Sequence, residues 1–170
     1  MKGLTLTQPY ATLVAIGAKH IETRSWSTAY RGLVAIHAGQ GLGPVGGLLG
    51  LQALCADEPF TTVLEKCVVH PQSPHARDWR PTDLPYGAIV AVARLVDCRK
   101  TQLLEGVTVF EGGHEWRLTD QERAFGDCTL GRFAWLLADV QRLAEPVPCR
   151  GALGLWTVPE AAEAAVRGQL

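Results

Sequence analysis

Short apolar runs separated by turn-forming residues dominate the chain and predict a protein built mainly of strands. The predicted strands, chosen by apolar–polar alternation or by a continuous aliphatic core, are residues 3–8, 19–24, 32–39, 87–98, 132–143 and 151–157. A weaker hairpin is predicted over 107–118, around Gly112 and Gly113. Strands do not alternate regularly with helices. The pattern therefore favours an α+β, mainly β protein, a small β-barrel decorated with short helices.

Proline and glycine mark the predicted helices. Pro9 precedes a helix over 10–16, and Gly17 is suited to end it because glycine tolerates the left-handed cap. An alanine-rich helix follows Pro159 and ends at Gly168. A helical turn is expected over 120–126, and a loose helix before Cys55.

Two irregular stretches interrupt the pattern. Residues 39–50 are rich in glycine and residues 70–85 are rich in proline, so both are expected to be long loops. Neither is a linker long enough to divide the chain. We therefore expect one domain over residues 1–170.

Composition excludes several classes of protein. The chain has 170 residues, of which 47% are hydrophobic and 19% charged, and its net charge is −1. Proteins that wrap duplex DNA nonspecifically are usually strongly basic, so that class is disfavoured. No apolar run reaches the roughly 18 residues of a membrane span, and the N-terminus is a poor secretory signal. A cytoplasmic protein without a membrane partner is expected.

The five cysteines include no C-x-x-C pair, which favours reduced, mostly buried thiols. Cys67, His70 and His75, with Cys55 upstream, have the residue types of a zinc site. Their spacing matches no standard finger, and prolines interrupt the segment. Scattered loop and core residues are the favoured interpretation, so neither a metal nor another cofactor is predicted.

The segment GAKHIETRSW, residues 17–26, places charge between apolar segments. Lys19 suits a phosphate or a base carbonyl, Glu22 suits an exocyclic amine, and Arg24 suits a phosphate. The alternative is a surface ion pair. In a strand over 19–24, Lys19 and Glu22 leave opposite faces unless a bulge or turn intervenes.

These residues resemble the opening of the ASCH domain family. The matching positions are Gln8, Pro9, Tyr10, Ala11, Gly17, Lys19, Glu22, Arg24, Trp26, Arg31 and Gly32. The later GRFAWLLADVQRLAEPVPCRGALGLW is similar to the family's closing strands, with insertions near 42–82 and 104–120. The resemblance implies a PUA-like β-barrel with a cleft that binds RNA or another nucleic acid.

A second polar group, in ERAFGDCTLGR, also resembles a family pattern and is expected opposite Lys19. It contains Glu122, Asp127, Thr129 and Arg132; its alternative role is a capped turn that enters a strand. The predicted nucleic-acid contacts are Gln8, Tyr10, Lys19, Glu22, Arg24, Trp26, Arg31, His37, Asp127, Thr129 and Arg132.

Several of these residues have a purely structural alternative. Tyr10 and Trp26 either stack on a base or pack in the core, and His37 is more often a satisfied core histidine. Gln8 either reads a base edge or caps the first helix. Arg24 and Arg31 either bind phosphate or brace a loop through a carboxylate. Trp135 and Trp156 are assigned to the core.

The leading functional hypothesis is a small cytoplasmic nucleic-acid-binding domain for RNA or single strands. The alternative is a hydrolase acting on a modified nucleoside or an RNA-cleaving enzyme, with Lys19 as base and Glu22 assisting. The resemblance implies this alternative, because a bacterial branch of the family hydrolyses N4-acetylcytidine with a lysine, a threonine and a glutamate. That branch places threonine three residues after the lysine; here Glu22 stands there and Thr23 follows. A third possibility is a partner-docking domain with a vestigial cleft.

Overall fold

The computed structural model describes residues 1–42, 46–67, 80–104, 107–110 and 118–170. The strands are β1 (Lys2–Leu6), β2 (Ile21–Arg24), β3 (Gly32–Ala38), β4 (Ala88–Leu104), β5 (Val107–Phe110), β6 (Phe133–Pro148) and β7 (Leu155–Thr157). The helices are α1 (Tyr10–Ala15), α2 (Gly47–Ala56), α3 (Phe60–Cys67), the 3₁₀ turn η2 (Pro81–Asp83), α4 (Asp120–Ala124) and α5 (Glu160–Arg167).

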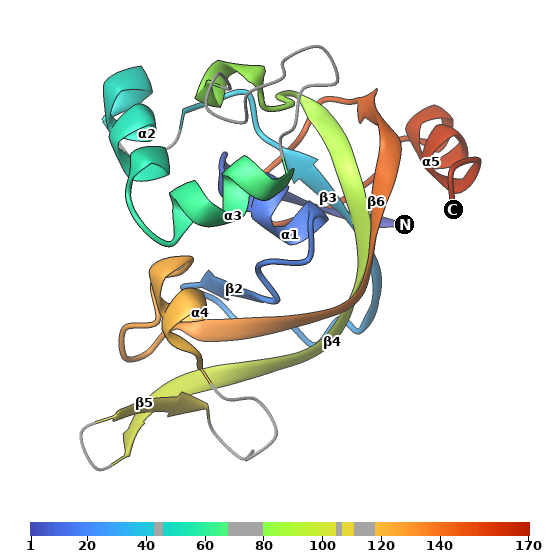
Figure 1. The fold of residues 1–170 in the computed structure, drawn as a ribbon. Coiled ribbons are helices and arrows are strands. Elements are labelled where there is room, and N and C mark those ends of the chain that lie inside the picture. Colours follow the sequence, from blue (N-terminus) through green and yellow to red (C-terminus); the bar gives the residue numbers. More distant parts are fainter. Residues whose placement is uncertain (43–45, 68–79, 105–106, 111–117) are drawn as a thin grey trace.

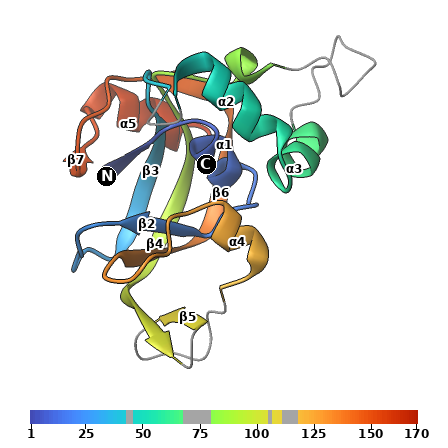
Figure 2. The same cartoon turned by 90° about the vertical axis from the view of Figure 1, so that its left-hand side faces the viewer.

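One curled sheet forms a half-barrel (Figures 1 and 2). Its strands follow the order β2-β6-β4-β3-β1-β7, with β5 paired to β4 beyond this path. Only β1 and β3 pair in parallel; the other described pairs are antiparallel. Within the described ranges, the two end strands of this order, β2 and β7, do not pair with each other, so the barrel stays open. Because β7 covers only Lys2–Leu4 of β1, the opening extends along the last residues of β1.

The curl comes from β4 and β6, the two longest strands, which bend together (Figure 1). Their pairing shifts register between Ile89 and Ala91, between Val92 and Arg94, and again before Asp97. Each shift is a bulge or another irregularity of the pairing, and bulges increase local bending and twist. These irregularities help the two strands to bend and form both walls of the half-barrel.

The main core lies inside the curl. Helix α1 contributes Ala11, Val14 and Ala15 to the cluster that contains Trp135 and Leu137 of β6. The short helix therefore plugs the half-barrel, because its small side chains allow close approach to the sheet. Trp135 and Trp156 are both buried, which confirms their assignment to the core.

A second cluster joins α2 and α3 to α1. Leu51 of α2, together with Phe60 and Leu64 of α3, packs with Leu13 of α1 and with Phe125 after α4. Helices α2 and α3 are thus held against α1, and all of these side chains are buried.

The predicted fold class is confirmed as a mainly β half-barrel with short helices. The helix that starts at Pro159 and the end of α1 at Gly17, whose φ is 72°, are also confirmed. Helix α3 was missed, although Phe60, Val63, Leu64 and Cys67 follow the i, i+3, i+4, i+7 spacing of an amphipathic helix.

Some strand boundaries were wrong. β6 continues to Pro148, because its prolines fall where β2 no longer covers the outer edge and no ladder donor is needed there. The closing strand is shorter than 151–157, since only Leu155–Thr157 pairs with β1. The segment Val107–Phe110 pairs with β4, whereas the turn predicted around Gly112 and Gly113 lies outside the described residues.

Within the described parts of the chain, no helix is long and apolar enough to cross a membrane.

Replacing Leu137 with alanine tests the position of the core. Leu137 is fully buried, whereas Leu130 is 58% exposed and serves as the matched control. Leu137→Ala is expected to lower the free energy of unfolding by about 2–5 kcal/mol, because it leaves a cavity between β6 and α1. Leu130→Ala should change it by less than about 0.5 kcal/mol. Urea unfolding measures both, and equal effects would contradict this core.

Candidate functional site

Lys19 lies between α1 and β2 with a side chain that is only 1% exposed. Its ammonium donates to the carbonyl oxygens of Ile21 and Phe125, the latter at 2.7 Å. Its Nζ also lies 3.6 Å from Oε2 of Glu22. A buried charge is costly unless it is paired and hydrogen-bonded, and these acceptors satisfy that requirement.

The strand predicted over 19–24 begins only at Ile21, so its predicted start is wrong, and a turn of the kind that lets Lys19 and Glu22 share a side is present. The chain turns out of α1 before the strand, since the Lys19 N–H donates to the carbonyl of Leu13. The alternation does hold further on: Ile21 and Thr23 are buried, while Glu22 and Arg24 are partly exposed. The turn brings the lysine and the glutamate together.

Glu22 and Arg24 extend the contact across the opening of the half-barrel. Arg24 Nε lies 3.0 Å from Glu22 Oε1, an ion pair by distance but without hydrogen-bond alignment. Arg24 Nη2 donates to the carbonyl of Thr5 on β1 at 2.8 Å. This Lys19–Glu22–Arg24 network therefore links β2 to β1, where the strands do not pair.

Tyr10 stands beside the network at the start of α1. Lys19 Nζ lies 5.9 Å from the centroid of its ring, which also makes an edge contact with Phe60. Burial, followed by the charge of Glu22 and of Cys55, raises the pKa of the Tyr10 hydroxyl. The ring is therefore a neutral, half-buried wall of the site, and Phe60 of α3 supports it.

The second polar group does approach Lys19, as predicted. Phe125 supplies one of its acceptors, and a Cβ added to Gly126 would lie 3.2 Å from Nζ. The buried carboxylate of Glu122 accepts from the N–H groups of His20, at 2.7 Å, and Ile21, at 3.3 Å. Helix α4 thus fixes the start of β2 through Glu122, whose side chain is only 8% exposed.

Asp127 lies at the edge of this group, where it forms an ion pair with Arg132 and a turn with Thr129. Asp127 accepts from the N–H and hydroxyl of Thr129, which lowers the carboxyl pKa; the nearby Arg132 guanidinium adds to this effect. Arg132 Nη1 lies 3.2 Å from Asp127, and Nη2 donates to the carbonyl of Thr23 at 3.4 Å. Arg132 is therefore anchored to β2 while remaining 30% exposed.

Gln8 is placed as a helix cap and not at an accessible base-reading position. Its side chain is fully buried, accepts from the N–H of Thr12 and donates to the carbonyl of Pro85 at 2.7 Å. Both ends of the amide are satisfied within the protein. The sequence could not distinguish the two roles, because Pro85 is distant along the chain.

Arg31 and Trp26 contact residues outside the Lys19–Glu22–Arg24 network. Arg31 braces its own turn by donating to the carbonyls of Thr28 and Tyr30, and it pairs with Asp97 at 3.0 Å. Trp26 packs edge-on against Trp135 and is 36% exposed. Arg31 thus fills its alternative, loop-bracing role, whereas Trp26 keeps one accessible face.

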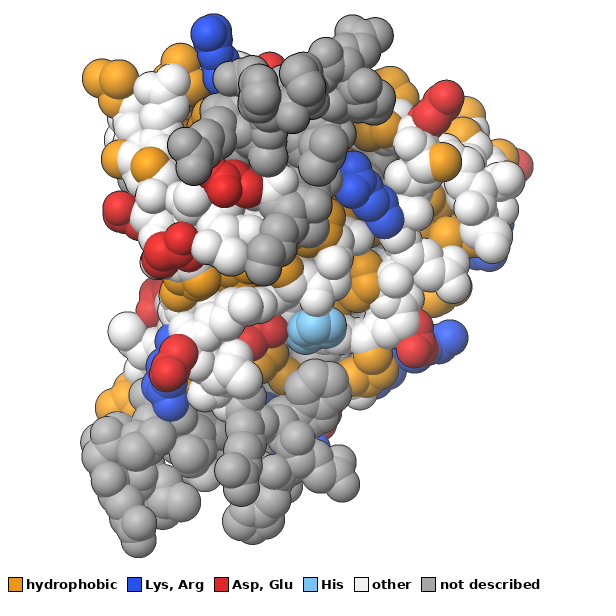
Figure 3. All heavy atoms as spheres, viewed as in Figure 1, with side chains coloured by type: hydrophobic (Ala, Val, Ile, Leu, Met, Phe, Trp, Pro, Cys, Tyr) orange, Lys and Arg blue, Asp and Glu red, His pale blue; other side chains and the backbone are white. Residues whose placement is uncertain are grey.

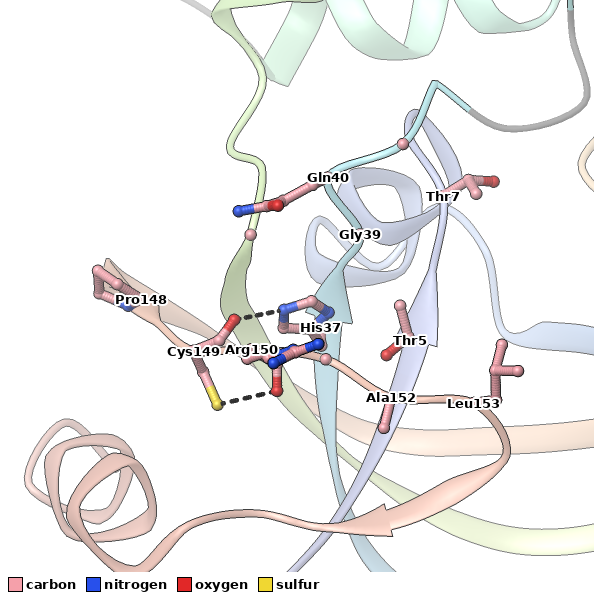
Figure 4. Close-up of a pocket in the computed structure, with 13 residues that line it drawn as sticks. Thr5, Thr7, His37, Gly39, Gln40, Pro148, Cys149, Arg150, Ala152 and Leu153 are labelled. Atoms are coloured by element: carbon pink, nitrogen blue, oxygen red, sulfur yellow. Dashed lines mark hydrogen bonds between the residues drawn. The ribbon is translucent and has the colours of Figure 1, made fainter.

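His37 lies at the end of β3 and lines a cavity of roughly 950 Å³. Figure 4 shows this cavity between the ends of β1 and β3 and the chain that follows β6. The side chain is 2% exposed, and its Nε2 lies 2.9 Å from the carbonyl oxygen of Cys149. Burial lowers the pKa of His37, so the neutral form is favoured. Sequence reasoning missed Arg150 and Gly151, which also line this cavity.

The four cysteines described are unpaired, and Cys55 is buried, which raises its pKa to about 11. In the described ranges, no three His, Cys, Asp or Glu side chains are grouped so that they could hold a metal ion. The side chain of Cys67, and all of His70 and His75, lie outside the described residues.

A family model, the ASCH domain, matches residues 4–146. This chain belongs to the ASCH domain family. The ASCH domain is a PUA-like fold family often linked to RNA binding. A mutant of the protein ZmASCH from Zymomonas mobilis has a similar structure, with a TM-score of 0.50 and 14% identity, covering 98% of this chain and 96% of that one. At that identity the likeness supports the fold alone. The comparison with curated proteins gives no match.

Lys19→Met tests the network of this ASCH domain. The substitution leaves two buried carbonyl oxygens and Glu22 without their cation, so the free energy of unfolding should fall by about 3–5 kcal/mol. Lys100→Met is the matched control, because Lys100 is exposed on β4. Chemical unfolding of both variants gives the comparison. A loss no greater than that of the control would contradict a central role for the buried ammonium.

His37 gives a pH-dependent prediction. Because its pKa is lowered in the folded state, the unfolded chain binds more protons below the ordinary pKa of about 6.5. The contribution of neutral His37 to the free energy of unfolding is therefore fully present above about pH 6.5, and it is lost as the pH falls through the folded-state pKa. Between about pH 7.5 and pH 5, the wild type should therefore lose more stability than His37→Gln. Thermal unfolding across this range is the measurement; parallel curves would refute it.

Proposed function

We propose that this ASCH domain binds RNA or single-stranded nucleic acid at the opening between β2 and β1. The observation that carries the proposal is Arg24, whose guanidinium spans the opening from Glu22 to Thr5 and whose side chain is still 24% exposed. Because Nη2 of Arg24 is already bonded to the Thr5 carbonyl, the remaining donors of the guanidinium are held in a fixed orientation. A phosphate that binds to them then costs less conformational entropy.

The surroundings of Arg24 supply the other elements of single-strand recognition. Arg132 donates to the carbonyl of Thr23, which lies on β2 next to Arg24, and the side chain of Arg132 is partly exposed. Tyr10 and Trp26 each present part of an aromatic ring. Cationic groups combined with aromatic faces are how single strands are commonly held. Two cations, Lys19 and Arg24, stand against one carboxylate in the network, which favours an anionic ligand.

A few contacts suit a single strand better than a long duplex footprint. The net charge is −1, and Figure 3 shows acidic and basic side chains intermingled on one face, without a continuous basic stripe among the residues coloured there. Duplex binding by phosphate contacts alone needs such a stripe.

Lys19 has a positioning role in this proposal. Its ammonium is enclosed by Ile21, Phe125 and Glu22, so it holds Glu22 and, through it, Arg24. This enclosure does not favour the alternative in which Lys19 is the base of a hydrolase, since a base needs an accessible lone pair. A cytoplasmic location is part of the proposal and rests on the sequence.

Titration with short single-stranded RNA, single-stranded DNA and duplex DNA at two salt concentrations tests the function. Arg24→Gln should weaken single-strand binding about tenfold or more, because it removes a charge-assisted contact. It should also reduce the salt slope by about 1. Arg132→Gln should act in the same direction.

Arg94→Gln is the matched control, because Arg94 is 50% exposed and pairs with Asp139 at the surface. It should leave binding unchanged. Tight binding of duplex alone, or no binding to any polymer, would contradict the proposal. Mass spectrometry of the recovered ligand separates a binder, which returns it intact, from an enzyme.

A further inference from the structure

The cavity at the ends of β1 and β3 is elongated. Figure 4 shows Pro148 and Leu153 at its two ends. Residues 148–153 run along one long side, and Gln40 and Thr7 stand along the other. A cavity of this form suits a length of extended chain better than a compact ligand.

Three polar side chains on the rim of this cavity are free to donate hydrogen bonds. Arg150 and Gln40 are exposed, and Thr7 is partly exposed. Within the described parts of the chain, no hydrogen bond or ion pair engages the side chains of these residues. A guanidinium has only donors, while a hydroxyl and a side-chain amide each offer at least one. The complement of this rim is therefore a ligand that is rich in acceptors.

The charge of the cavity wall favours an anionic ligand. Among the described residues that line the cavity, Arg150 carries a charge and none is acidic. His37 stays neutral because burial lowers its pKa. A Cβ added to Gly151 would lie 2.5 Å from the His37 ring, so this ring is a packed part of the wall and not a ligand contact. The positive charge of Arg150 is thus not offset by a carboxylate of the wall.

Glycines form much of the remaining wall, namely Gly39, Gly41, Gly87 and Gly151. Glycine has no side chain that keeps a ligand away from the backbone, so a bound chain can approach closely. Phosphate oxygens of nucleic acids are commonly contacted by arginine, glutamine and threonine side chains and by backbone N–H groups. The composition of this cavity therefore fits a phosphodiester chain.

We propose that this cavity binds the sugar–phosphate backbone of a single strand. Arg150 holds one phosphate, and Gln40 and Thr7 donate to neighbouring oxygens of the same backbone. The choice of nucleic acid rests on the proposed function, whereas the need for an extended anion with many acceptors comes from the cavity itself. Because these contacts are to the backbone, binding in this cavity is independent of base sequence.

Thr5 lies between this cavity and the opening at Arg24. Its carbonyl accepts from Arg24 at 2.8 Å, and its side chain lines the cavity. β7 pairs with β1 only over Lys2–Leu4, so no described strand pairs with Thr5 on that side. In the proposal, one strand passes from Arg24 over the end of β1 into the cavity, and Arg24 and Arg150 contact different phosphates.

Single-stranded RNA in which one phosphate at a time is replaced by an uncharged methylphosphonate tests this proposal on the full chain. Titrations followed by fluorescence anisotropy compare the wild type with Arg24→Gln and Arg150→Gln. Arg150→Gln should weaken binding of the unmodified strand about tenfold, to the same extent for different base sequences. It should also reduce the salt slope by about 0.7. The methylphosphonate that abolishes the effect of Arg150→Gln should lie at a different phosphate from the one that abolishes the effect of Arg24→Gln.

Arg142→Gln removes an exposed arginine of β6 and is the matched control, which should leave the affinity unchanged. Circular dichroism checks that each variant is folded. An effect of Arg150→Gln no larger than that of the control would overturn the inference. Polyglutamate bound as tightly as the RNA would overturn it as well, since the cavity would then select charge and not a phosphodiester chain.

Failure of this inference can be distinguished from failure of the proposed function. If single strands bind with a dependence on Arg24 but not on Arg150, the inference fails and the proposed function stands. If binding depends on Arg150 but not on Arg24, the cavity stands as a backbone site and the site proposed at the opening fails. If no polymer binds to the wild type, both fail.

Discussion

The buried ammonium of Lys19 is the interaction on which the arrangement of this domain depends. It joins three parts of the chain that the sheet does not connect: the exit from α1, the start of β2 and the end of α4. Removing a charge from water is costly, so the network is favourable only as a complete set of partners. Because Glu22 completes that set and also pairs with Arg24, the position of Arg24 depends on a residue that solvent hardly reaches.

The open edge of the sheet gives this network its importance. A closed barrel would join its two end strands, here β2 and β7, through backbone hydrogen bonds, and its edges would be satisfied. Here the side chain of Arg24 crosses the opening and bonds the Thr5 carbonyl. The opening is therefore lined by polar side chains, and the His37 cavity lies on the other side of Thr5. The open edge of the sheet thus determines both the form of the half-barrel and the position of the candidate site.

Helix α3 contributes to the site as well as to the packing of the core. Phe60 of α3 packs against Tyr10 and also against Phe125, whose carbonyl accepts from Lys19. Helix α3 thus supports both an aromatic wall of the opening and the residue that anchors the ammonium.

The sequence alone determined which segments form most of the strands, although not all of their bounds, and also the ends of α1 and α5, the burial of Trp135 and Trp156, and membership of the ASCH family. These features depend on local periodicity, on proline and glycine, and on ordered motifs, all of which can be read over short distances. The tertiary structure alone decided the roles of the polar residues. Lys19 is buried because Phe125, 106 positions away, accepts from it, and His37 is oriented by Cys149, 112 positions away. Whether a polar side chain faces a ligand or is satisfied internally depends on such distant partners, and no local pattern encodes them.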